Sequence, residues 1–110
     1  MSEAKRRNNH GRYIELHKHS QPVRLAAHAI GLDQKRPYMR HGKTFYRPYR
    51  NYFSTHDKTH DYTVWKGLCG NGYARSCPSG TRGSYTFWLA RAGLDWLGET
   101  LGITIHDEED

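Results

Sequence analysis

Glycine and proline interrupt this 110-residue chain so often that no regular element can be long. A helical pattern that begins near Ser20 stops at Gly31, and a second one that begins near Thr59 stops at Asn71-Gly72. Glycine favours the left-handed conformation that ends helices. The segment between the two patterns contains two prolines, which break any long helix. The chain must therefore fold from several short elements, and its length is that of one domain.

The first helix is clearly marked. Ser20 can cap its N-terminus, and Pro22 is tolerated in the first turn. Its apolar residues recur at the i, i+3, i+4 and i+7 spacing of one helical face: Val23, Ala26, Ala27 and Ile30. Before this helix, the pattern of residues 12–17 predicts a short strand or an extended lead-in.

The second half of the chain has the pattern helix, hairpin, helix. Thr59 or Asp61 can cap the first of these helices. Two β-prone runs, "YARSC" and "SYTFWLA", flank the turn-rich segment "PSGTRG", which favours a hairpin. Three leucines mark the final helix, which is expected to end near Gly102 before a short "ITI" extension: Leu94, Leu97 and Leu101.

This half of the chain resembles the winged-helix family. The residues that carry the resemblance lie between positions 59 and 102: Leu68, Gly72-Tyr73, Arg75 to Cys77, Tyr85, Phe87, Leu89, Gly93 and Leu97. The resemblance implies an α+β, winged-helix-like fold of three short helices with a β-hairpin, the wing, in the C-terminal half. The segments "RPYRNYF", "DYTVW" and "GLCGNGYA" also resemble small phage- and prophage-encoded proteins of unassigned role.

The chain departs from the winged-helix pattern at two places. Ala90 stands where the family has a capping threonine, and alanine cannot accept a cap hydrogen bond. The helix in the recognition position carries one basic residue, Lys66, and starts with Asp61. A reading helix normally offers Arg, Lys, Asn or Gln to base edges. The winged-helix-like fold is therefore one prediction, and the use of this helix to read DNA bases is a second prediction that can fail while the first holds.

Charge divides the chain into three parts. Residues 1–12 are predicted to form a flexible basic arm, residues 13–105 a single winged-helix-like domain, and residues 106–110 an acidic tail. The whole chain has a formal charge of +6. Without the last four residues, which are all acidic, the 17 basic residues stand against 7 of the 11 acidic ones, a net charge of +10. Such a body is expected to bind polyanions at low salt.

The segment from Gln34 to Phe53 is the strongest functional signal. It contains no acidic residue, and it is expected to form either an ordered loop or one to two short strands around a His41-Gly42 turn. Its cations can neutralise phosphates: Lys35, Arg36, Arg40, Lys43, Arg47 and Arg50. Its aromatic residues can stack on bases: Tyr38, Phe45, Tyr46, Tyr49 or Tyr52, of which Tyr49 is assigned to the predicted site. The alternative is that the aromatic residues form the core and the cations a solvated face.

The predicted hairpin of the second half adds a smaller set of cations. Lys66, Arg75 and Arg82 can lie along a nucleic-acid backbone. Arg82 lies between Gly80 and Gly83, where a contact residue would be exposed. An ordinary polar hairpin tip is the alternative.

Metal binding and catalysis have little support in the sequence. Seven residues separate Cys69 from Cys77, whereas zinc knuckles use a tight two-residue spacing, so no metal or cofactor is predicted even with His56 and His60 nearby. No nucleophile elbow and no glycine-rich phosphate loop is present, and the chain is predicted not to be an enzyme. A nuclease based on His56 and His60 is the remote alternative.

The predicted partner is nucleic acid, DNA more than RNA, with a homodimer as an option. No stretch reaches the about 18–20 apolar residues that a bilayer requires, and no secretion signal is evident. The chain is therefore expected in the cytoplasm, that of a bacterial host if a phage encodes it. The alternative function is a phage-encoded, anti-CRISPR-like inhibitor of a host protein such as a defence nuclease or polymerase. A third option is a structural subunit of a larger assembly.

Overall fold

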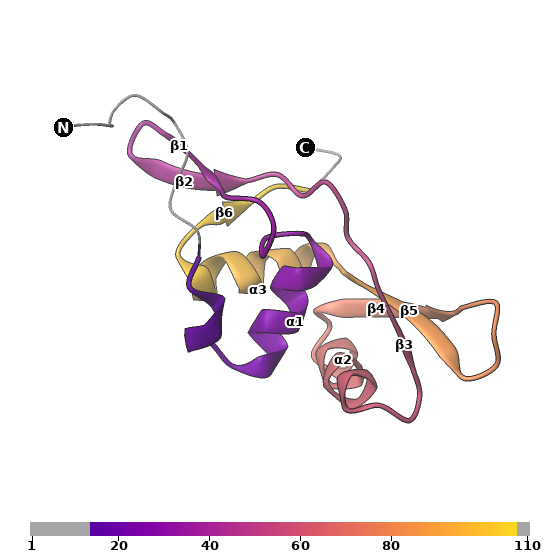
Figure 1. The fold of residues 1–110 in the computed structure, drawn as a ribbon. Helices are drawn as coiled ribbons and strands as arrows, with labels where there is room; N and C mark the ends of the chain where they lie inside the picture. Colours follow the sequence, from indigo (N-terminus) through magenta and orange to yellow (C-terminus); the bar gives the residue numbers. More distant parts are fainter. Residues whose placement is uncertain (1–13, 108–110) are drawn as a thin grey trace.

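The structure, a computed structural model, describes residues 14–107 (Figure 1). The predicted basic arm and the last three residues of the predicted acidic tail lie outside the described residues. The elements are, in chain order, a short 3-10 helix (Leu16–Lys18), α1 (Gln21–Ala29), β1 (Tyr38–Arg40), β2 (Lys43–Tyr46), β3 (Phe53–His56), α2 (His60–Gly70), β4 (Ala74–Pro78), β5 (Ser84–Leu89), α3 (Arg91–Leu101) and β6 (Thr104–Ile105). Among these residues, the predicted α+β class with three α-helices is confirmed.

The helix α1 begins and ends as its sequence predicts. Ser20 is its N-cap residue in an extended conformation, and Pro22 lies in the first turn. Gly31 follows the helix with a φ of 81°, the left-handed conformation that ends it. Of the short strand and the extended lead-in that the sequence left as options over residues 12–17, no strand forms in the described part. Local backbone hydrogen bonds close a 3-10 turn there instead, among them the one from the N–H of His19 to the carbonyl of Leu16 at 2.9 Å.

The first sheet has the strand order β1-β2-β6. β1 and β2 form an antiparallel hairpin in which Arg40 pairs with Lys43. The turn residues His41 and Gly42 have φ values of 52° and 78°, the left-handed pair that a two-residue hairpin turn of type I′ requires. The sequence left an ordered loop and one or two short strands as options around this turn, and the structure has two strands. The last two residues of the "ITI" extension form β6, which pairs in parallel with β2.

The second sheet has the strand order β3-β5-β4, and both of its pairs are antiparallel. β4 and β5 form the hairpin predicted for the second half. Asn51 continues the ladder beyond β3 with its side chain. Its amide donates to the carbonyl of Leu89 and accepts from the N–H of Leu89, both at 2.9 Å. Asn51 thereby fixes where the β2–β3 linker (residues 47–52) enters this sheet.

The helices α2 and α3 differ in how they are capped. Thr59 caps α2, and its hydroxyl accepts a hydrogen bond from the N–H of Tyr62 at 3.1 Å. Ala90 precedes α3 without a side-chain cap, as the sequence implies, and Gly102 ends that helix with a φ of 76°. The sequence left Thr59 and Asp61 as alternative caps, and the geometry selects Thr59.

The hydrophobic core joins both sheets to the three α-helices. Trp65 of α2 is fully buried between Phe53 of β3 and Phe87 of β5, with ring centroids 5.6 and 5.5 Å away. Trp96 of α3 packs against the core and stacks on Tyr73 at 4.9 Å. Two of the three tryptophans, Trp65 and Trp96, therefore contribute to the core.

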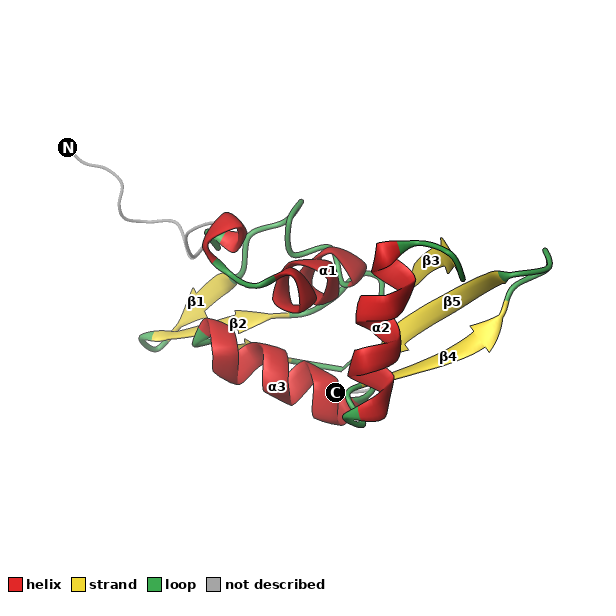
Figure 2. Ribbon diagram, turned by 90° about the horizontal axis from the view of Figure 1, so that it is seen from below, coloured by secondary structure: helices red, strands yellow, loops and turns green. Residues whose placement is uncertain are grey.

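The molecule is elongated, with principal extents of 54 × 26 × 23 Å. The β1–β2 hairpin lies at one end and the β4–β5 hairpin at the other, with α1 between them (Figure 1 and Figure 2). None of the described helices is long and apolar enough to cross a membrane.

Candidate nucleic-acid interface

Nine of the ten predicted site residues are exposed, and the tenth, Arg50, is half-buried. They come from three parts of the fold. The β1–β2 hairpin and its approach supply Arg36, Arg40 and Lys43, the α1–β1 loop and the β2–β3 linker supply Lys35, Arg47, Tyr49 and Arg50, and α2 and the β4–β5 hairpin supply Lys66, Arg75 and Arg82.

The tight turn of the first hairpin brings two cations together. Arg40 at the end of β1 pairs with Lys43 at the start of β2, so two exposed like charges lie directly opposite each other. Arg47 follows the last residue of β2. In residues 14–107, none of these three side chains has a carboxylate within 4.0 Å. Like charges opposite each other are destabilising, and a bound phosphate would relieve that repulsion.

Tyr49 is held between two cations. The Nζ of Lys35 lies 5.4 Å and the Cζ of Arg50 lies 5.5 Å from the centroid of its ring. The ring also closes on Gly31, where a Cβ would collide with it. Half of the side chain, 51%, stays exposed. Tyr49 therefore gathers two positive charges at the surface and leaves part of its ring accessible.

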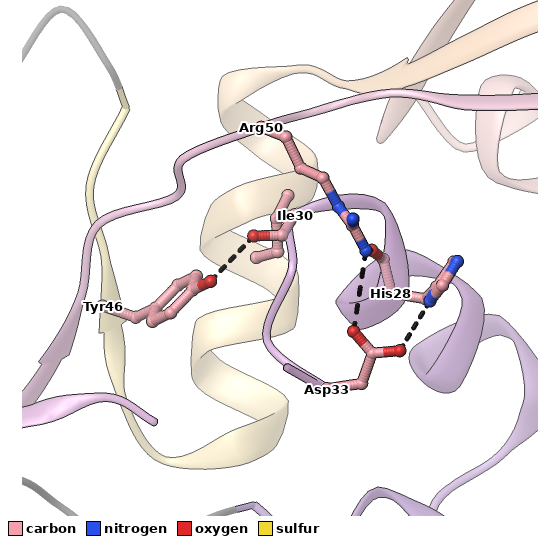
Figure 3. A network of polar contacts seen from close by, with 5 residues as sticks. All are labelled: His28, Ile30, Asp33, Tyr46 and Arg50. Atoms are coloured by element: carbon pink, nitrogen blue, oxygen red, sulfur yellow. Dashed lines mark hydrogen bonds and ion pairs between the residues drawn. The ribbon is translucent and has the colours of Figure 1, made fainter. Parts of the chain in front are cut away.

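Arg50 is anchored to the end of α1 (Figure 3). Its Nη2 donates to the carbonyl of His28 at 2.8 Å and lies 3.7 Å from the Oδ1 of Asp33. The Oδ2 of Asp33 contacts the Nδ1 of His28 at 2.6 Å. Part of the charge of Arg50 is thus balanced within the protein. Arg47, on the same linker, has no carboxylate within 4.0 Å among residues 14–107.

The aromatic residues of this segment are divided between core and surface. Tyr46 is buried and donates its hydroxyl to the carbonyl of Ile30 at 2.8 Å (Figure 3), so it cannot stack on a base. Burial is the main cause that raises the pKa of Tyr46 well above its ordinary value. Tyr38 and Phe45 stack on each other across the hairpin with centroids 5.8 Å apart. Tyr52, in contrast, is 57% exposed.

The remaining three predicted residues surround the second sheet. Lys66 is exposed on α2, Arg75 is exposed on β4, and Arg82 lies in the connection between β4 and β5. This sheet and the β1–β2 hairpin lie at opposite ends of the molecule (Figure 1). The fold therefore spreads the ten predicted residues along the molecule: Arg36, Arg40 and Lys43 lie at or near the first hairpin, Lys66, Arg75 and Arg82 lie around the second sheet, and the four residues of the loop and linker lie between them.

The sequence pattern gave Trp88 no part in the predicted nucleic-acid site. In the structure it is half-buried and pairs with Arg75 across the β4–β5 ladder. The available signal was the alternation along β5: Phe87 and Leu89 are buried, so the residue between them must face the opposite way.

The histidines and cysteines do not gather. The Nε2 of His60 contacts the Oε1 of Gln21 at 2.8 Å, and the Nδ1 of His56 lies 3.5 Å from the Oδ1 of Asp57. Within the part of the chain that the structure describes, no group of three or more His, Cys, Asp or Glu residues could hold a metal ion. Cys69 and Cys77 are free thiols.

The fold and these side chains define a small, elongated α+β protein with exposed basic groups at both ends. Comparison with known protein families, with curated proteins and with solved structures found no match for the chain.

Proposed function

We propose that this chain is a small, non-catalytic nucleic-acid-binding protein that works in the cytoplasm, with DNA favoured over RNA. The observation that carries the proposal is the set of exposed cations without a carboxylate partner among the described residues: Arg40, Lys43 and Arg47. Each phosphate that such a cation neutralises releases counterions, which favours binding at low salt. Lys35 and Arg50 around Tyr49 extend this positive surface along the linker.

The winged-helix-like fold is part of the proposal. The sheet order β3-β5-β4, with α2 packed on the sheet and the β4–β5 hairpin as a wing, supports it. α2 would take the recognition position, but it carries Lys66 as its one Lys or Arg and has Asp61 in its first turn. Phosphate binding is therefore assigned to the β1–β2 hairpin and the linker, and base reading by α2 is not part of the proposal.

Titration of a labelled DNA duplex with the full chain tests this assignment. Arg47→Ala removes one free cation, so the slope of log affinity against log salt should become shallower by about 1. Arg24→Ala, which removes an exposed charge from α1, is the matched control and should change neither the slope nor the affinity. No binding at about 50 mM salt, or equal effects of the two substitutions, would refute the proposal.

The alternative function, a phage-encoded inhibitor of a host protein, gives a different result in a capture experiment. The tagged chain is incubated with a bacterial lysate that has been treated with nuclease. A protein retained in stoichiometric amount after the treatment would favour the inhibitor. Nucleic acid that is retained only when nuclease is omitted would favour the proposal.

A further inference from the structure

The β3-β5-β4 sheet has one face without a helix. Its inner face packs on α2, where Phe53 and Phe87 enclose Trp65. Among the helices that the structure describes, none lies on the other side of this sheet (Figure 1). Side chains alternate between the two faces of a strand, so the neighbours of the buried rings lie on this outer face.

The register of the strands shows which residues share the outer face. Arg75 of β4 pairs with Trp88 of β5, and Ser54 of β3 pairs with Thr86 of β5. The hydroxyl of Thr86 contacts the hydroxyl of Ser54 at 3.2 Å. The side chains of Ser54 and Thr86 therefore lie on the same face of the sheet. Phe53 pairs with Phe87, so continuing the alternation by one residue beyond β3 puts Tyr52 next to Trp88 on the outer face.

Three side chains of this row are available to a ligand. Tyr52 is 57% exposed, Arg75 is exposed and Trp88 is half-buried. Within the described residues, neither Tyr52 nor Trp88 contacts another ring, and Arg75 forms no ion pair. The outer-facing residues of all three strands include no carboxylate.

We infer that the outer face of this sheet binds an unpaired stretch of nucleic acid, with bases stacked on Tyr52 and Trp88 and a phosphate at Arg75. The inference rests on the proposed function and names the state of the nucleic acid that it takes. Bases in a duplex already stack on each other, so an open sheet face cannot reach their rings. An unpaired base offers its whole face, and aromatic side chains accept any base in this way.

Two features favour an unpaired nucleic acid as the ligand over a further β-strand that pairs with the sheet: the charge of the outer face and the residue at the end of β4. Arg75 brings positive charge to β4, and the outer-facing residues of the strands include no acid; the carboxylate of Asp57 lies beside Gly83, at the hairpin end of the sheet. β4 ends at Pro78, which has no N–H to offer, and a proline at a sheet edge hinders the addition of a further strand. The face thus suits a polyanion with exposed rings.

Tyr52→Ala is the first test, because Tyr52 is mostly exposed and its loss leaves the core intact. Full chains are titrated with a thymidine oligonucleotide, an unpaired RNA of equal length and a DNA duplex. Tyr52→Ala should weaken the binding of the unpaired strands by about 5- to 150-fold, the usual effect of losing one stacked base. The affinity for the duplex should stay unchanged. Met39→Ala, which truncates an exposed apolar side chain of β1, is the control and should leave all three affinities unchanged.

Tryptophan fluorescence gives a second readout of stacking. Trp65 is fully buried and Trp96 stacks on Tyr73, so Trp88 should account for quenching by the thymidine oligonucleotide. Trp88→Phe keeps an aromatic ring at this position and should abolish the quenching, while circular dichroism checks that the fold is kept.

The possible failures of the two proposals differ. If Trp88→Phe is quenched as strongly as the wild type, or if Tyr52→Ala binds unpaired strands as well as the wild type, the sheet-face inference is wrong. If Arg47→Ala still weakens the binding of nucleic acid in that case, the proposed function stands although the sheet-face inference fails. If the wild type binds none of the three nucleic acids, both proposals fall.

Discussion

At the scale of single residues, the hydrogen bonds of a few polar side chains determine which residues of the linker are exposed. Asn51 acts as a substitute for strand backbone, because its side-chain amide makes both hydrogen bonds that a further residue of β3 would make with Leu89. Its position sets the parity of the residues that follow, so that Phe53 enters the core and Tyr52 faces outward. Arg50 similarly ties the linker to α1 through the carbonyl of His28.

Asn51→Ala tests this role. The N–H and the carbonyl of Leu89 would lose the two hydrogen bonds that they form with the side chain of Asn51. The free energy of unfolding should therefore fall by about 1–3 kcal/mol. Urea unfolding measures the change. Asn71→Ala, at the exposed end of α2, is the control and should change stability by less than about 0.5 kcal/mol. Equal effects of the two substitutions would contradict the account of Asn51.

Tyr46 gives the fold a defined dependence on pH. Burial raises the pKa of its phenol above the ordinary value of 10.0, so the folded protein holds this proton more tightly than the unfolded chain does. The resulting contribution to stability is complete below pH about 10 and is lost as the pH rises above that value. Tyr46→Phe should cost about 1–2 kcal/mol at neutral pH, because the carbonyl of Ile30 loses a donor.

Urea unfolding at neutral and alkaline pH checks this prediction. The wild type should lose stability above pH about 10 more steeply than Tyr46→Phe, which has no phenol to titrate at this position. Tyr52→Phe removes an exposed phenol and should follow the wild type. If Tyr46→Phe declines as steeply as the wild type, the buried phenol is not the source of the pH dependence.

At the scale of elements, the close approach of α3 to the start of β4 depends on one glycine. A Cβ on Gly93 would collide with the carbonyl of Tyr73. This carbonyl accepts the N–H of Ala90 at 2.9 Å, so it cannot move without losing the bond that holds the start of α3. Gly67 of α2, by contrast, has open space around the position of a Cβ.

Alanine at these two positions should therefore have opposite effects. Gly93→Ala should destabilise the protein by about 1–3 kcal/mol through overpacking. Gly67→Ala should stabilise it by up to about 1 kcal/mol, because alanine favours the helical backbone. Thermal unfolding of both variants measures the difference. A Gly93→Ala variant as stable as the wild type would mean that the helix can shift freely.

The sequence predicted those elements whose signals are local. Ser20 and Gly31 bound α1, and the His41-Gly42 turn and the "PSGTRG" connection mark the two hairpins. The pairing of β6 with β2 joins residues far apart in the chain through two residues only, so no periodic pattern could indicate it. The 3-10 turn at Leu16–Lys18 is equally short, and its alternating residues favoured a strand.

The candidate site was predicted less completely, for a related reason. Exposure of the cations follows from their chemistry, and nine of the ten residues are exposed. Where they gather depends on tertiary structure, and the sequence could not place β1, which contains Arg40, and β4, which contains Arg75, at opposite ends of the molecule (Figure 1). It also could not assign Trp88 to an open sheet face, because that requires knowing which side α2 covers.

At the scale of the whole molecule, two positive regions lie along a body whose longest extent is 54 Å. One contains the hairpin and linker cations with Tyr49, and the other contains Arg75 and Arg82 beside the open sheet face. A polyanion long enough to reach both would gain from each without a new contact between them. We therefore expect longer unpaired strands of nucleic acid to bind more tightly than short ones.

The salt dependence of binding is the decisive test of whether the exposed cations contact phosphates. The full chain is titrated with a labelled thymidine oligonucleotide at several salt concentrations, and log affinity is plotted against log salt. Phosphate contacts by Arg40, Lys43 and Arg47 alone predict a slope of about −2, at roughly −0.7 per contact for a single strand, and contacts at the second region make it steeper. A flat plot, or no binding at about 50 mM salt, would contradict the claim that this surface meets a polyanion.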